Sequence, residues 1–200
     1  MTRFVVVLFG LFWSASFAQS ALGSCQLEGA WSLNPNSLAL MLQQKLDPEE
    51  TLWFASAVGE FTLELSELER TADSATLAAT YSVVDLDHEY GHIAERVMTE
   101  ENAVKLVLNG VRGGYLYTFH TDGSLDIAYA PAEDTADTLE AVTNVGDAPD
   151  LLAEVEWFGA PALDATFLCP DENTLNIFPE LVEPMFAEAR IGQLPFRRIE

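Results

Sequence analysis

The chain has 200 residues and a formal net charge of −23, because 32 Asp and Glu stand against only 9 Lys and Arg. This balance argues against nucleic-acid binding, which depends on a basic surface that neutralises phosphates, and it opposes binding to anionic membranes. Since 49% of the residues are hydrophobic and 10% are aromatic, the chain is also too apolar for a disordered acidic tail, and we expect one folded domain.

The first 18 residues have the pattern of a secretory signal peptide. Arg3 is followed by an apolar run over residues 4–13 and then by the small residues Ser16 and Ala18. The run is shorter than the roughly 20 residues that a membrane-spanning helix needs. We therefore expect export to the periplasm or the exterior, a single mature domain over residues 19–200 and no membrane span. A buried N-terminal helix is the alternative.

The two cysteines, Cys25 and Cys169, are open to two interpretations. An even pair in an exported chain predicts a disulfide, which would close almost the whole mature chain. Residues 22–25 (Leu-Gly-Ser-Cys) also resemble a bacterial lipobox, whose cysteine would carry a lipid anchor. The apolar core of the leader ends well before this box, and a structured motif begins four residues after Cys25. The disulfide is therefore favoured over the anchor.

The mature chain begins with a strand-like segment over residues 26–33, which helix signals follow. Asn34-Pro35 supplies a helix cap and a first helical residue. A second capping pattern begins at Asp47, with Glu50 three residues later. Together these signals predict a helical insertion over about residues 35–58.

After the insertion the apolar period changes from 3.6 to 2, which is the period of a half-buried strand. Asp122-Gly123 is a strong hairpin signal between two of the strand-like segments. These segments cover residues 61–65, 76–84, 104–108, 115–119, 125–129, 165–169, 174–178 and 194–199. The acidic stretch over about residues 131–156 predicts a loop or a short surface helix. The expected fold class is mainly β, an antiparallel barrel of about eight to nine strands with the helical insertion after the first strand.

One pattern is typical of catalysis, His88-Glu89-Tyr90-Gly91-His92. On a helix, histidines four residues apart reach one Zn²⁺ and the glutamate serves as general base, as in zinc peptidases. Acidic residues before His88, the helix-weakening Gly91 and the strand-like run upstream favour an inert surface turn instead. Zinc binding by His88 and His92, with His120 as a third ligand, and zinc-dependent hydrolysis with Glu89 as the base are the alternatives.

The two ends of the mature chain carry a family resemblance. Gly29-Ala30-Trp31 resembles the Gly-x-Trp motif of lipocalins and related calycin barrels. In that family the tryptophan closes one end of the barrel and an arginine from the last strand lies across its ring. Arg197 and Arg198 stand in the last strand-like segment here, and many lipocalin-like proteins tie a late strand to the N-terminal segment by a disulfide. The helical insertion and the lack of a match to the family's middle motif are departures from its pattern.

The resemblance implies a barrel that encloses a small apolar ligand. Alternation places the candidate lining residues on one face of each strand, although a packed core would have the same pattern. The candidates are Phe61, Leu63, Tyr81, Leu106, Tyr115, Tyr117, Phe119, Ile127 and Tyr129.

Three functions are therefore compared. The first is a non-enzymatic, exported lipocalin-like protein without a cofactor, which binds a small apolar ligand or serves as an accessory protein of the cell envelope. The second is the zinc-binding protein or zinc hydrolase described above. The third is a structural or interaction module whose acidic surface recruits cations or a basic partner.

Overall fold

A computed structural model describes residues 21–46, 52–92, 103–144, 163–179 and 193–199. The expected signal peptide over residues 1–18 lies outside this part of the chain. The elements are η1 (Ala21–Ser24), β1 (Gly29–Leu33), α1 (Pro35–Leu46), β2 (Leu52–Arg70), β3 (Ser74–His92), β4 (Val104–His120), β5 (Ser124–Tyr129), β6 (Glu140–Thr143), β7 (Leu163–Asp171), β8 (Thr174–Pro179) and β9 (Leu194–Arg198).

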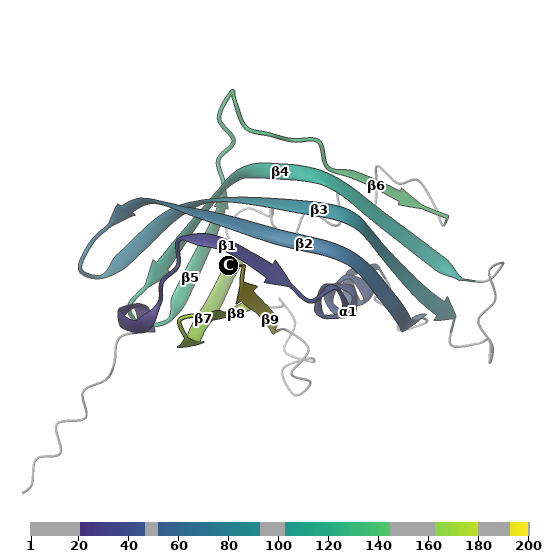
Figure 1. Ribbon diagram of the computed structural model, residues 1–200, viewed down its shortest axis with the longest axis horizontal. Coiled ribbons are helices and arrows are strands. Elements are labelled where there is room, and N and C mark those ends of the chain that lie inside the picture. Colours follow the sequence, from purple (N-terminus) through teal and green to yellow (C-terminus); the bar gives the residue numbers. More distant parts are fainter. Residues whose placement is uncertain (1–20, 47–51, 93–102, 145–162, 180–192, 200) are drawn as a thin grey trace, which may run out of the picture.

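The strands form a closed antiparallel barrel (Figure 1). Their order is β3-β2-β1-β9-β8-β7-β5-β4, and β4 pairs back onto β3, which closes a ring of eight strands. The ninth strand, β6, pairs with the half of β4 that β5 leaves free. The mainly β barrel with a helix after the first strand, which the sequence predicts, is confirmed.

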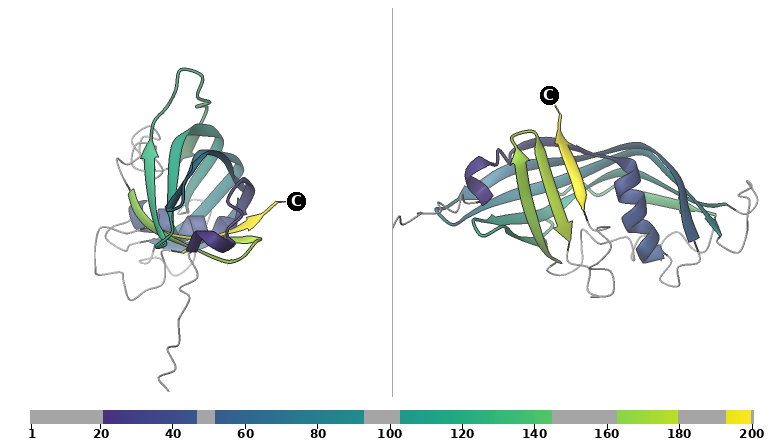
Figure 2. Two further views of the ribbon diagram at one scale, coloured as in Figure 1. Left: turned by 90° about the vertical axis from the view of Figure 1, so that its left-hand side faces the viewer. Right: turned by 90° about the horizontal axis from the view of Figure 1, so that it is seen from below.

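The strands β2, β3 and β4 have 17 to 19 residues each and reach well beyond the closed ring. Within β2, only residues 61–65 pair with β1, and within β4, only residues 115–119 pair with β5. The remaining halves form, together with β6, a second part of the sheet that we call the sheet extension (residues 52–60, 86–92, 104–109 and 140–143). Helix α1 packs beneath the extension, beside β9 (Figure 2).

A line of backbone irregularities marks the boundary between the barrel and the extension. The register of β2 against β3 shifts at Gly59, which has a φ of 106°, and that of β3 against β4 shifts next to Asp85, with a φ of 46°. A Cβ on Gly59 would lie 2.2 Å from the carbonyl oxygen of Asp85, so a side chain does not fit there. On β3 the bulge exchanges the two faces of the strand. Val83 is the last inward residue before the bulge and Leu86 is the first after it.

The helical insertion predicted over residues 35–58 is correct only for its first part. Asn34 caps α1, since its Oδ1 accepts a hydrogen bond from the Asn36 amide at 2.9 Å. Residues 52–58 belong to β2 instead, where they pair with residues 87–92 of β3. Trp53 lies against Gly91 of the neighbouring strand, and such cross-strand packing outweighs local helix propensity.

The acidic stretch also contains a strand. Glu140–Thr143 forms β6, and residues 131–139 run beside β4 towards it, with Thr138 exchanging hydrogen bonds with Val111. The expected loop or surface helix is therefore wrong over residues 140–143. Residues 145–156 of the stretch lie outside the described ranges.

The expected disulfide between Cys25 and Cys169 is present, and it joins the segment between η1 and β1 to β7. Because a thioether anchor would need the same sulfur of Cys25, the disulfide excludes the lipid anchor in this structure. Within the ranges described above, no helix combines the length and apolar character that crossing a bilayer requires.

Candidate functional site

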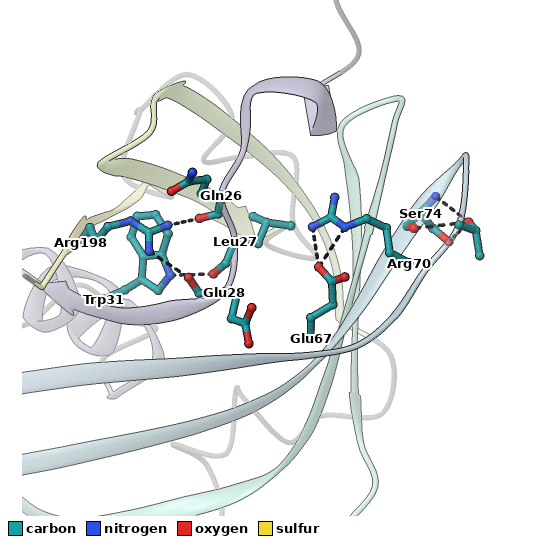
Figure 3. A network of polar contacts seen from close by, with 9 residues as sticks. Gln26, Leu27, Glu28, Trp31, Glu67, Arg70, Ser74 and Arg198 are labelled. Carbon is teal, nitrogen blue, oxygen red and sulfur yellow. Dashed lines mark hydrogen bonds and ion pairs between the residues drawn. The ribbon is translucent and has the colours of Figure 1, made fainter.

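Trp31 on β1 and Arg198 on β9 lie against each other where the first and last strands pair (Figure 3). Trp31 is fully buried, and its Nε1 donates to the carbonyl oxygen of Leu27 at 2.9 Å. The guanidinium carbon of Arg198 lies 4.4 Å from the ring centroid of Trp31, which is a cation–π contact. The same guanidinium donates to the backbone carbonyls of Gln26, Glu28 and Glu172. Arg198 thus ties the N-terminal segment to the β7–β8 turn.

Arg197 has a different position from its neighbour. Its side chain is exposed on the other face of β9 and donates to the hydroxyl oxygen of Thr174. Of the two candidate arginines, Arg198 is therefore the one that lies across the tryptophan ring.

The nine candidate lining residues all lie on the inner face of the strands. Eight of them are buried, and Tyr129 is half-buried against the core. Four inward aromatic side chains from consecutive strands β2 to β5 form a continuous row, which we call the aromatic row (Phe61, Tyr81, Tyr115 and Tyr129). Successive ring centroids in this row are 5.5, 5.8 and 5.1 Å apart. These distances are those of interacting aromatic pairs.

The aromatic row ends at a positive charge. The guanidinium carbon of Arg112 lies 5.2 Å from the ring centroid of Tyr129, and its Nε is 3.9 Å from a carboxylate oxygen of Asp137. Burial, followed by the neighbouring Tyr115, raises the pKa of Tyr81 far above its ordinary value. Tyr81 therefore stays protonated and presents an apolar ring with a neutral hydroxyl group.

The zinc-peptidase pattern lies on strand β3 and not on a helix. Four residues along a strand span about 13 Å, so the helical face that would bring His88 and His92 to one ion is absent. The side chain of His92 lies outside the described part of the structure. Glu89 points away from His88 and forms an ion pair of 2.7 Å with Lys105.

His120 is also remote from this pattern. It is the last residue of β4, with its Nε2 2.9 Å from a carboxylate oxygen of Asp126, whereas His88 pairs with Leu106 near the other end of that strand. Among the described residues, no three His, Cys, Asp or Glu side chains are grouped as metal ligands would be.

His88 itself is not in the inert surface turn that the sequence predicts. It is fully buried on the inner face of the sheet extension. Burial lowers the pKa of His88 to about 4, so the imidazole is neutral near pH 7. Its ring packs against Tyr90 with 6.3 Å between centroids, and the Tyr90 hydroxyl donates to the Ala39 carbonyl oxygen of α1 at 3.0 Å. The alternation of Leu86, His88 and Tyr90 is the sequence signal that would have identified this strand.

Comparison with known proteins identifies no relative of this chain. No family model, no curated protein and no solved structure matches the chain.

Proposed function

We propose that the protein is an exported, non-enzymatic lipocalin-like barrel that holds a small apolar ligand against the aromatic row. The aromatic row carries the proposal, because four consecutive strands present interacting rings towards the inside of a closed barrel. Aromatic and aliphatic linings with few polar groups are typical of sites for small apolar molecules. The Tyr81 hydroxyl supplies a neutral polar contact within the row.

The contact between Trp31 and Arg198 supports the lipocalin-like part of the proposal. It stands in the first and last strands, as the resemblance implies. A barrel of eight strands has an interior wide enough for side chains or for one small ligand. The leader pattern and the disulfide support export, since disulfides persist in oxidising compartments.

Ligand binding is tested by titrating the mature protein with the fluorescent apolar probe N-phenyl-1-naphthylamine. We expect one saturable site. Tyr115→Leu should lower the affinity for the probe about tenfold, because it removes a ring that contacts two others in the row. Leu168→Ala is the matched control, since Leu168 is half-exposed on the outer face of β7 and should leave affinity unchanged.

Absence of saturable binding by the folded wild-type protein would reject the carrier function. Equal affinities of the wild type and Tyr115→Leu for the probe would instead show that the probe does not bind at the aromatic row. Export is tested separately by the mass of the mature protein from the periplasm or medium, which should correspond to loss of the leader and retention of one disulfide.

A further inference from the structure

We propose that the sheet extension holds the uncharged polar head group of an amphiphilic ligand, and that His88 is the residue that binds this group. The inference rests on the proposed function and deepens it, because it assigns the apolar tail of the ligand to the aromatic row and its head to a second place on the same strand, β3.

The first observation is that His88 is a buried polar residue without partners. Both of its ring nitrogens are inaccessible to solvent, and neither has a hydrogen-bond partner among the described residues. Buried polar groups in native proteins are nearly always hydrogen-bonded, and leaving one unpaired is destabilising. A neutral imidazole has one donor and one acceptor, so His88 is suited to a group that both accepts and donates.

The second observation is that the described inward residues next to His88 are uncharged. Its register neighbours are Ala57 on β2 and Leu106 on β4, and Leu86 and Tyr90 flank it along β3. The charged side chains nearby lie on the outer face of the sheet, where Glu89 pairs with Lys105. An anionic head group at His88 would therefore meet no counter-charge from the described residues around it, whereas an alcohol would bring no charge that needs one.

The third observation is that His88 and the aromatic row share one inner surface. The β3 bulge brings Leu86, His88 and Tyr90 to the side on which Tyr81 and Val83 face inward. Seven residues along a strand separate Tyr81 from His88, which corresponds to about 20 Å. A ligand that contacts both is therefore a long-chain molecule. Tyr90, which flanks His88, is linked to α1 by the hydrogen bond from its hydroxyl to the Ala39 carbonyl oxygen.

The test uses two long-chain probes that differ in hydrogen bonding, hexadecanol and fluorohexadecane, which compete with the fluorescent probe on the full mature protein. The affinity for hexadecanol divided by that for fluorohexadecane should be about tenfold higher in the wild type than in His88→Leu, since the variant lacks the imidazole hydrogen bonds. His120→Leu is the matched control, because His120 is half-buried at the far end of β4 from the residue that pairs with His88, and it should keep the wild-type preference.

Equal preference in the wild type and in His88→Leu would overturn this inference while leaving the proposed function intact. Failure of both probes to bind the folded wild type would overturn both. Tighter binding of hexadecanoate than of hexadecanol at pH 7.5 would overturn the assignment to an uncharged head group.

A second measurement keeps the test decisive if His88→Leu does not fold. The ring nitrogens of His88 in the wild type are followed by NMR while each probe is added. Hexadecanol should shift the His88 signals and fluorohexadecane should not. Unchanged signals at saturating hexadecanol would refute the contact.

Discussion

The buried imidazole of His88 should make the protein sensitive to acid in a defined pH window. Burial lowers the pKa of His88 from its ordinary value of 6.5 to about 4 in the folded protein. The unfolded chain therefore binds a proton between these values that the folded chain does not. The contribution to stability is fully present above pH 6.5 and is lost as the pH falls towards 4. At about 1.4 kcal/mol per pH unit, the loss from His88 alone is about 3 kcal/mol.

The assay compares urea unfolding of the wild type and of His88→Leu at pH 7.5 and pH 4. Carboxylates titrate in both proteins, so the difference between them isolates His88. The wild type should lose about 3 kcal/mol more unfolding free energy than the variant between the two pH values. The same loss in both proteins would refute the assignment of this acid sensitivity to His88. An NMR titration of the folded wild type in which His88 protonates near pH 6.5 would refute it as well.

Two further predictions concern the contacts that join the N-terminal segment to the barrel, and both are measured by urea unfolding. Replacing Cys25 and Cys169 by serine should lower the unfolding free energy by about 4 to 5 kcal/mol on the chain-entropy model, because the bridge spans 144 positions. Reductant should cause a similar loss in the wild type and none in the variant; an equal effect on both would contradict this origin. Arg198→Lys should cost about 1 to 2 kcal/mol, since an ammonium cannot reproduce the planar stacking on Trp31 together with the backbone hydrogen bonds. The control Arg197→Lys, at an exposed side chain, should change stability by less than about 0.5 kcal/mol, and equal losses would disprove a special role of Arg198.

Most of the barrel was predictable because its strands obey the period-2 rule over short distances. The inward positions around Tyr115 to Phe119 and Leu125 to Tyr129 alternate without interruption, and Asp122-Gly123 marks the turn between them. The cap at Asn34 was equally local, since it depends on residues within one helical turn. Such signals are contained in a few neighbouring residues and need no knowledge of the rest of the chain.

The sheet extension was not predictable from the same local rules. Residues 52–58 form a strand because residues 87–92 pair with them, and this pairing depends on contacts distant in sequence. The alternation in β3 and β4 predicts shorter strands than the structure has, because it shifts near Asp85 and Gly110. His88 follows the first of these shifts, so its burial depends on the pairing of the whole strand.

The bulge on β3 acts as a change of parity in the sequence. Before it, odd-numbered residues such as Tyr81 face the interior, and after it even-numbered residues such as His88 do. A regular strand with the same residues would direct the imidazole outwards and the acidic side chains of Asp87 and Glu89 inwards. Loss of a single residue between Val83 and Leu86 would place Leu86 two positions after Val83, so His88 would stay inward without a bulge. The one extra residue of the bulge is therefore what lets two segments of opposite parity line the same interior.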